Sequence, residues 1–292
     1  MSFSSDVKKE LAGQIGKARH CQLAELAAIV SFLGKLSRTN GTLQLKIETA
    51  NPMLKQKYQL LLQQLFQTGQ AETLQILESV KMWDIQKGCL KNMDVADGLL
   101  IQQNCCRRAF IRGAFLACGS VSNPKKAYHF EIVCRTKNQA GQLSNVIQSF
   151  DIDAKIVVRK NHQVVYVKEG AHIVDLLNIM EAHVALMDLE NVRIVKEMRN
   201  SVNRRVNCET ANIGKTVNAA VRQMEDILFI QNTRGLESLP EHLREIASLR
   251  LEYPDASLKE LGTYLNPPVG KSGVNHRLRR ISEIAAGINT ER

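Results

Sequence analysis

The sequence has 292 residues, of which 44% are hydrophobic and 23% charged, as is ordinary for a globular protein. It contains no apolar run of about 18 residues, which argues against a transmembrane helix, and its first ten residues lack the apolar segment of a signal peptide. The formal charge of +10 favours a polyanionic partner, with nucleic acid first. We therefore expect a cytoplasmic, nucleoid-associated protein of two or three domains with no membrane partner.

The seven cysteines are odd in number and include no Cys-x-x-Cys pair, and Cys105 and Cys106 are adjacent. This pattern is typical of reduced, mostly buried thiols in a reducing compartment. From the sequence we expect neither a disulfide nor a metal ion nor a cofactor.

The first two thirds of the chain predict one set of elements that occurs twice. Helices are expected over 4–16, 21–34 and 52–67, a hairpin turn at 39–41 before a strand at 42–48, and a strand at 72–78. The second set has helices over 105–118, 137–149 and 170–180, a turn at 122–125, and strands over 128–133, 154–158 and 164–167. The two sets are offset by 85 residues, taken between Gly34 and Gly119, the glycines that close helices 21–34 and 105–118.

Each set contains an apolar helix that is rich in small residues and ends at a glycine, Gly34 or Gly119. Small residues at four-residue spacing let two helix backbones approach closely; they are Ala24 and Ala28 in the first copy and Gly113 and Ala117 in the second. Residues 26–34 and 111–119 resemble the nine-residue motif of the LAGLIDADG homing endonucleases. That resemblance implies two such helices packed at the centre of a saddle-shaped protein.

The resemblance also implies that the residue before the last glycine of each motif is the carboxylate that binds the catalytic metal. Here those positions hold Leu33 and Cys118. Divalent magnesium prefers oxygen ligands, which leucine lacks and a thiol replaces poorly. We therefore expect no enzymatic activity, and we name Leu33 and Cys118 as degenerate positions of a site that holds no metal.

Residues 196–215 are polar and rich in asparagine, which favours turns and caps, and we interpret them as a linker. An amphipathic connecting helix is expected over 216–230. Three later patterns then predict three short helices: Pro240 in a first turn, a capping box over 257–260, and Ser272 as the cap of the last helix. This order favours a helix-turn-helix domain, although a plain three-helix bundle with a solvated basic face stays open.

The last helix carries residue types that contact DNA. Asn275, His276 and Arg279 are our candidates for base edges, because Asn and Arg pair with adenine and guanine. Arg277 and Arg280 are expected to contact phosphates. Lys271, Ser272 and Gly273 stand at the helix start, where backbone N–H groups favour a phosphate. Further candidate DNA contacts are Arg199, Arg204, Arg205, Lys125 and Lys126.

A degenerate LAGLIDADG pair followed by a helix-turn-helix resembles the WhiA family of bacterial transcription regulators. The most specific stretches are 201–212 and 265–277. The resemblance implies an α+β fold: a pseudo-two-fold LAGLIDADG-like domain followed by an all-α helix-turn-helix domain. The expected parts are 1–100 and 101–195 for the two repeats, 196–232 for the linker and connecting helix, and 233–292 for the helix-turn-helix domain.

The function implied is a sequence-specific, DNA-binding transcription regulator linked to cell division, chromosome segregation or sporulation. The front domain would serve as a saddle for double-stranded DNA or as a docking platform for another regulator or RNA polymerase components. The alternatives are an active LAGLIDADG-type endonuclease and a scaffold that binds no DNA. The oligomeric state stays open, and a monomer is compatible with one chain that carries both repeats.

Overall fold

The computed structural model describes residues 2–39, 42–67 and 71–290 of the chain. These residues form two compact units, Met1–Glu197 and Met198–Arg292, each with its own hydrophobic core. Asn40 and Gly41, in the hairpin turn predicted from the sequence, lie outside the described residues.

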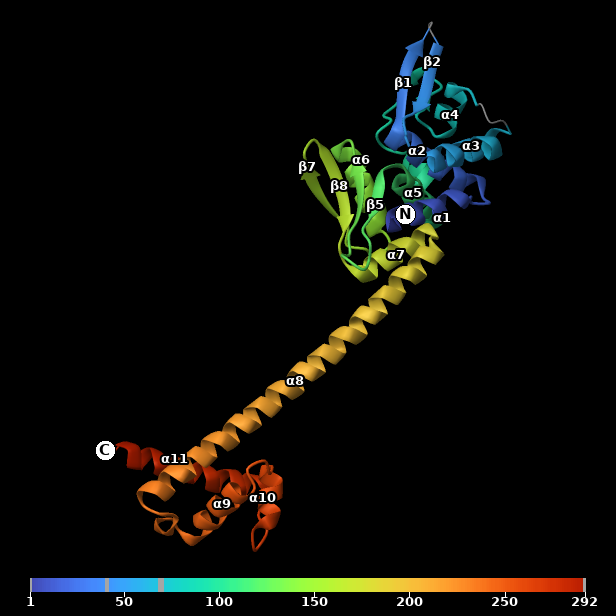
Figure 1. Cartoon of the computed structure of the whole chain (residues 1–292). Coiled ribbons are helices and arrows are strands. Elements are labelled where there is room, and N and C mark those ends of the chain that lie inside the picture. Colours follow the sequence, from blue (N-terminus) through green and yellow to red (C-terminus); the bar gives the residue numbers. More distant parts are fainter. Residues whose placement is uncertain (1, 40–41, 68–70, 291–292) are drawn as a thin grey trace. The chain divides into compact units, whose positions relative to one another are not determined.

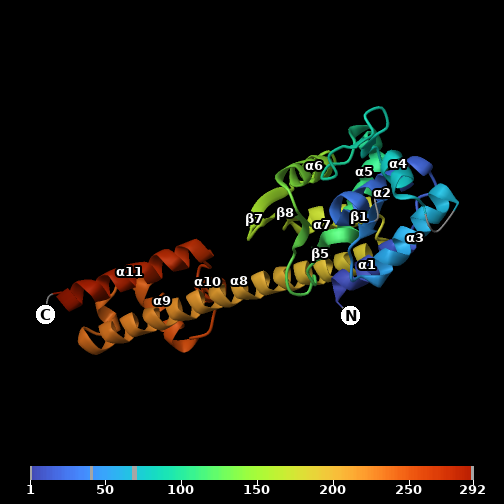
Figure 2. The same ribbon diagram turned by 90° about the horizontal axis from the view of Figure 1, so that it is seen from above.

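The first unit is built from helices, most of which lie where the apolar periodicity predicts them. They are α1 (Phe3–Gly13), α2 (Arg19–Leu33), α3 (Pro52–Phe66), α4 (Thr73–Ser79), the short 3-10 helix η1 (Gly98–Ile101), α5 (Asn104–Cys118), α6 (Lys137–Gln148) and α7 (Gly170–Met180), followed by the start of α8 (His183–Thr233). In Figures 1 and 2, α1 and α3 lie side by side next to α2.

The strands of this unit pair only with antiparallel neighbours. β1 (Gly34–Thr39) pairs with β2 (Thr42–Ile47), and β3 (Trp83–Asp84) pairs with β4 (Cys89–Leu90). A four-stranded sheet has the order β5-β6-β8-β7, with β5 (Gly119–Val121), β6 (Phe130–Cys134), β7 (Lys155–Arg159) and β8 (His162–Val167). Its buried residues alternate along β6, as expected for a sheet with one face on the core.

Helices α2 and α5 form the centre of the unit, and almost all of their apolar side chains are buried. A Cβ atom added to Gly113 of α5 would lie 2.7 Å from the Glu25 carbonyl oxygen and 2.9 Å from the Ala28 Cβ of α2. The close approach predicted from the small residues is therefore confirmed at Gly113, where any larger side chain would push the two helices apart.

The glycines that follow α2 and α5 are required because a side chain would not fit there, and not because their backbone is left-handed. Gly34 and Gly119 have φ angles of −65° and −85°, which any residue can adopt. A Cβ on Gly34 would lie 2.4 Å from the Val30 carbonyl oxygen, and one on Gly119 would overlap Phe115. The turn from helix into strand is thus too tight for a side chain.

The first repeat differs from the second after its second helix. The strand expected at 72–78 is wrong, because residues Thr73–Ser79 form α4. Ile76 and Leu77 are adjacent and both buried, which suits one side of a helix and not the alternating faces of a strand. Thr73 Oγ1 also accepts a hydrogen bond from the Leu45 backbone N–H, tying α4 to β2. The order helix, hairpin, helix is shared by both repeats, but their later elements are not.

The second unit contains the rest of α8, the 3-10 helix η2 (Leu236–Ser238), α9 (Glu241–Glu252), α10 (Leu258–Tyr264) and α11 (Lys271–Thr290). Its core joins Ile227 and Ile230 of α8 to apolar side chains of α9, α10 and α11. Pro240 is the residue before α9 rather than part of its first turn. The three predicted helices and their order are otherwise confirmed.

The turns and caps expected over 196–215 are wrong, since these residues belong to the continuous 51-residue helix α8, whereas the assignment of this segment as a linker stays a prediction. Each asparagine lowers helix stability by only about 0.7 kcal/mol or less relative to alanine, and no proline interrupts the segment. Its residues are almost all exposed, including Val202, Val206 and Ile213. The polar composition therefore marks a solvated helix. None of the described helices combines the length and the apolar character that crossing a membrane requires.

Candidate nucleic-acid interface

Helix α11 has a buried face and an exposed polar face. Val274, Leu278 and Ile281 pack into the core of the second unit. Ser272, His276 and Arg279, at four- and three-residue spacing, are exposed on the opposite face. Asn275, Lys271 and Arg280 are also exposed, whereas Gly273 and Arg277 are half-buried. The structure thus brings six of the eight candidate DNA-contacting residues to the solvent-exposed surface of one helix.

The helix before α11 begins at the predicted capping box. Ser257 Oγ accepts a hydrogen bond from the Glu260 backbone N–H at 3.3 Å, and Glu260 Oε2 accepts one from the Ser257 N–H at 2.7 Å. A Cβ on Gly262 would lie 2.1 Å from the Val269 carbonyl oxygen, so the turn between α10 and α11 packs directly on the α10 backbone. This contact fixes where α11 starts.

The predicted cap at Ser272 is wrong, because α11 already begins at Lys271. The Val274 backbone N–H donates to the Gly270 carbonyl, which starts the helix one turn before the first buried residue. Lys271, Ser272 and Gly273 consequently lie in the first turn, where N–H groups lack partners within the helix. These three residues therefore lie at the helix start, and their contact with a phosphate stays a prediction. Ser272 is a residue of the first turn and not the cap.

Several cations of α11 already have partners in the unbound protein. Glu283 pairs with Arg280 at 2.8 Å and with Arg279 at 3.5 Å. The two arginine charges lower the pKa of the Glu283 carboxyl, first through the hydrogen bond from Arg280. The Arg277 guanidinium donates to the His242 carbonyl of α9 at 3.4 Å. DNA would therefore compete with an exposed carboxylate for Arg279 and Arg280.

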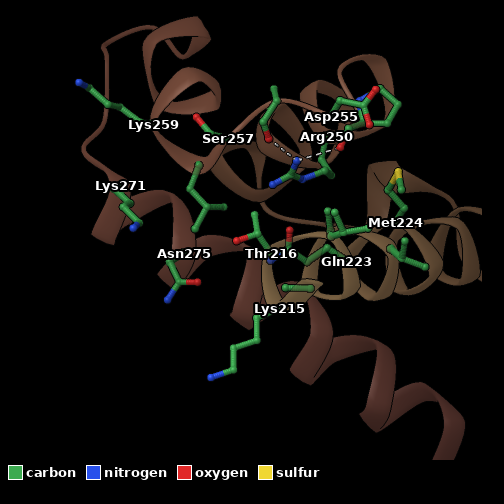
Figure 3. A pocket seen from close by; sticks show the side chains of 17 residues that line it. Lys215, Thr216, Gln223, Met224, Arg250, Asp255, Ser257, Lys259, Lys271 and Asn275 are labelled. Atoms are coloured by element: carbon green, nitrogen blue, oxygen red, sulfur yellow. Dashed lines mark hydrogen bonds between the residues drawn. The ribbon is translucent and has the colours of Figure 1, made fainter. Parts of the chain in front are cut away.

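A pocket of about 590 Å³ lies beside the start of α11 in the second unit. It is lined by α8, by the segment from Arg250 to Lys259, and by Lys271 and Asn275 of α11 (Figure 3). The buried Arg250 donates to the Pro254 and Ala256 carbonyls at 3.3 and 2.7 Å, and burial lowers its pKa. Asn275 is thus at the edge of the exposed face, whereas His276 and Arg279 are central to it.

The five further candidates for DNA contacts are all exposed to solvent. Arg199, Arg204 and Arg205 are exposed on α8, and Lys125 and Lys126 are exposed in the turn before β6. The first unit has 25 basic and 18 acidic residues, and the second has 14 and 11. Most of the positive charge therefore belongs to the first unit, although the base-reading candidates belong to the second.

Leu33 and Cys118 are the last residues of α2 and α5, as the motif predicts. Next to them lies Arg135, whose Nε donates to the Phe32 carbonyl at 2.8 Å and whose terminal nitrogens reach the Ser31, Phe32 and Gly34 carbonyls. A guanidinium thus satisfies carbonyls that the end of α2 leaves without helical partners. Sequence patterns gave no signal for this role of Arg135, which lies in the bend after β6, about 100 residues further along the chain.

The helix ends do not fit a catalytic divalent metal. Burial raises the pKa of the Cys118 thiol, while Arg135 and Lys8 oppose this shift. Two cations thus lie beside the only heteroatom that the two motif side chains offer. In the described parts of the chain, the one group of at least three metal-ligating side chains found lies elsewhere. Magnesium binds oxygen ligands, so a site that has two cations nearby and no carboxylate at either motif position disfavours it.

A buried ionic network joins α2 to α5 and α3. Glu25 accepts from Arg112 Nε and from Lys57 Nζ, both at 3.1 Å, and Arg112 also contacts Glu181 at 2.6 Å. Lys57 and Glu25 are fully buried, and burial lowers the Lys57 pKa against the opposing effect of Glu25. The sequence analysis did not identify these residues, because their charges are spread over 156 positions of an otherwise apolar pattern.

Comparisons with known proteins agree with these features. Three family models match: the WhiA N-terminal LAGLIDADG-like domain over 19–78, the WhiA LAGLIDADG-like domain over 107–199, and the WhiA C-terminal HTH domain over 202–285. A relative from Lachnoclostridium phytofermentans named "Probable cell division protein WhiA" is 50% identical, covering 99% of both chains. One of the same name from Alkaliphilus oremlandii is 51% identical, covering 98% of this chain and 97% of its own.

A solved structure has the same fold. The crystal structure of full-length DUF199/WhiA from Thermatoga maritima aligns with a TM-score of 0.56 at 24% identity, covering 98% of each chain. The α+β fold predicted from the sequence, a LAGLIDADG-like domain followed by a helix-turn-helix domain, is confirmed. With Leu33 and Cys118 in place of acids, this chain belongs to the WhiA family and carries its LAGLIDADG-like domain in degenerate form.

Proposed function

We propose that this protein is a sequence-specific, DNA-binding transcription regulator that acts in cell division. The observation that carries the proposal is the exposed face of α11, where His276 and Arg279 lie opposite the buried Val274 and Leu278. A helix packed on one side with Arg, His and Asn on the other has the form of a recognition helix that enters the major groove. The names of its relatives support the link to cell division.

Each residue has a distinct role in this proposal. Arg279 and His276 contact base edges, and Asn275 contacts a base at the edge of the helix face. Lys271 and the first-turn N–H groups bind one phosphate, and Arg277 and Arg280 bind others after exchanging their present partners for DNA. Chromosome segregation and sporulation are further processes that the same regulator would control, with the nucleoid as its place of action.

The first unit is proposed to bind without cleaving. Its excess of seven positive charges favours a DNA saddle, with Lys125 and Lys126 as contacts. Arg199, Arg204 and Arg205 would add phosphate contacts from α8. Leu33 and Cys118 replace the two metal-binding acids, and the Arg135 guanidinium binds the carbonyls next to Leu33, which further disfavours a divalent ion there. Docking of another regulator or of RNA polymerase is the competing use of the same surface.

Binding selection from random duplexes with the full-length protein would test the proposal. We expect an enriched motif, and a log–log salt dependence of affinity with a slope near about −4 if about four phosphates are contacted. Arg279→Ala should weaken binding to that motif by about 10-fold or more while changing non-specific binding little. Glu237→Gln is a control variant, since it changes one charge in η2 and none in α11. No enrichment with a slope near zero would refute DNA binding.

Incubation of supercoiled DNA with the protein and Mg²⁺ or Mn²⁺ tests the catalytic part. We expect the DNA to stay supercoiled. If nicking occurs and follows the protein through purification, the reasoning from Leu33, Cys118 and Arg135 is wrong. Leu33→Asp combined with Cys118→Asp is the informative companion variant: Arg135 should still prevent cleavage even after both carboxylates are restored.

A further inference from the structure

Four side chains with metal-binding atoms meet where α2 and α5 begin. His20 Nδ1 lies 3.2 Å from Cys106 Sγ, 3.4 Å from Cys21 Sγ and 3.9 Å from Cys105 Sγ. All four ligand atoms lie within 4.8 Å of one another. None of the three cysteines is in a disulfide. The cluster is far along the helices from Leu33 and Cys118, which lie at their opposite ends.

The spacing of these atoms suits one tetrahedral ion. With bonds of about 2.3 Å to sulfur and about 2.0–2.1 Å to nitrogen, tetrahedral ligands lie about 3.6 Å apart for a nitrogen–sulfur pair and about 3.8 Å apart for two sulfurs. The three nitrogen–sulfur distances of 3.2, 3.4 and 3.9 Å bracket the first value. The side chains therefore need only small movements to enclose an ion.

The internal repeat explains how the cluster arises. His20 and Cys21 are the second and third residues of α2, and Cys105 and Cys106 are the second and third residues of α5. The offset between the two pairs is 85 residues, the same as between Gly34 and Gly119. Equivalent positions of the two repeats thus face each other across the helix pair. No short-range cysteine motif exists because each repeat supplies only half of the ligands.

In the metal-free protein, burial raises the pKa of the Cys21 thiol to about 12 and also raises the pKa of the Cys106 thiol, and the two helix starts act against this shift. Ala18 and Gln103, the residues before α2 and α5, make no side-chain capping bond to a first-turn backbone N–H; Gln103 Oε1 instead accepts a hydrogen bond from Cys105 Sγ at 3.5 Å. Each first turn therefore leaves its N–H groups and its positive helix pole uncompensated by a cap. Thiolates at helix starts are stabilised by that pole. Three thiolates and a divalent ion have a net charge of −1, which two helix starts would offset.

We propose that His20, Cys21, Cys105 and Cys106 bind one Zn²⁺ ion as a closed structural site. Three soft sulfur ligands and an imidazole select zinc over magnesium or calcium, and four protein ligands leave no position open for catalysis. The ion links the first turns of α2 and α5 and so holds the two repeats together at the end of the helix pair opposite the degenerate motif positions. Cys106 is buried and packs on Ala24 and Ala109, so the site is anchored in the core.

Metal analysis of full-length protein, produced without a histidine tag and purified under reducing conditions without chelators, tests the proposal. We expect about one zinc per chain in the wild type and in Cys208→Ser, a control whose cysteine is exposed on α8, and below about 0.2 in Cys106→Ser. Chelation should lower the melting temperature followed by Trp83, the single tryptophan, by about 5 °C or more, and added zinc should restore it.

Cobalt titration keeps the test independent of variant folding. Reduced, zinc-depleted wild type should take up one Co²⁺ per chain and show thiolate-to-cobalt charge transfer together with the intense visible bands of tetrahedral cobalt. Zinc should abolish both signals. The proposal is overturned if neither zinc nor cobalt binds to the wild type, if Cys106→Ser keeps its zinc, or if mass spectrometry finds these cysteines in disulfides in the reduced preparation.

Discussion

Replacing Glu25 by Gln should strongly destabilise the first unit. Glu25 is the carboxylate that joins α2 to α5 and α3, with contacts of 3.1 and 3.2 Å to Arg112 and 3.1 Å to Lys57. Gln keeps the size and removes the charge, so the buried Lys57 loses its carboxylate partner, whereas Arg112 keeps Glu181. The contacts that Lys57 retains are then neutral acceptors, the new amide oxygen at position 25 and the Leu11 carbonyl at 3.3 Å. Breaking a buried pair from one side costs about 3–5 kcal/mol, and we expect a loss in that range.

Two companion variants separate charge from packing. Lys57→Met should cost about 1 kcal/mol or less, because Met fills the site and Glu25 keeps its bidentate contact with Arg112. The double variant should recover about 1–3 kcal/mol relative to additivity. Glu48→Gln is the control: its pair with Lys35 is 2.6 Å long but exposed, so its loss should change stability by about 0.5 kcal/mol or less.

The assay is urea unfolding of the full-length protein followed by Trp83 fluorescence. Trp83 is the single tryptophan and belongs to the first unit, so the signal reports the unit that contains the network. If Glu25→Gln lies within about 1 kcal/mol of the wild type at neutral pH, the network does not stabilise the fold as argued. A small effect would also follow if α3 opened locally and let the Lys57 side chain reach solvent. Rapid exchange of the backbone amides of α3 would reveal such an opening.

Three further predictions follow from the structure. Gly113→Leu should destabilise the first unit by about 3 kcal/mol or more in the same assay, whereas Gly141→Ala, with nothing near its added Cβ, should be neutral or stabilising by up to about 1 kcal/mol; equal effects would contradict close packing at Gly113. Burial alone would raise the Glu131 pKa, but His129 and Arg159 lower it overall, so its stabilising contribution is present above pH 4.5 and is lost as pH falls through the lowered pKa. Glu131→Gln should therefore reduce the fall in the free energy of unfolding on going from neutral to acidic pH, and an unchanged pH dependence would refute this. Glu283→Gln should tighten DNA binding and steepen its salt dependence, because it releases Arg279 and Arg280; weaker binding in a titration of fluorescent duplex would contradict it.

Local sequence patterns determined much of the architecture. The two apolar helices could be recognised because small residues at four-residue spacing and terminal glycines occur within single helices. The capping box before α10 could be recognised because both of its partners lie within four residues. The exposed and buried faces of α11 also follow from periodicity within one helix. The degenerate motif positions needed only the identities of Leu33 and Cys118.

Two local patterns gave the wrong secondary structure, because a polar segment can form a helix as well as a loop and a short apolar run can form a helix as well as a strand. Asparagines suggested turns over 196–215, but the helix continues through this segment, and side chains near both ends of α8 pack into cores: Ala185, Leu189, Ile227 and Ile230. The segment 72–78 was predicted to be a strand, but the side chain of Thr73 binds β2 and its apolar residues pack on one side. In both cases tertiary packing overrode local propensity.

The sequence by itself determined which helices exist, where several of them begin and end, and that the two motif positions lack carboxylates. Only the tertiary structure showed that Arg135 occupies the end of α2 and that Glu25 joins two buried cations. It alone also brought His20 and Cys21 to Cys105 and Cys106. The physical reason is that each of these sites draws its atoms from separate segments of the chain, some 85 or more residues apart, so no local spacing encodes them.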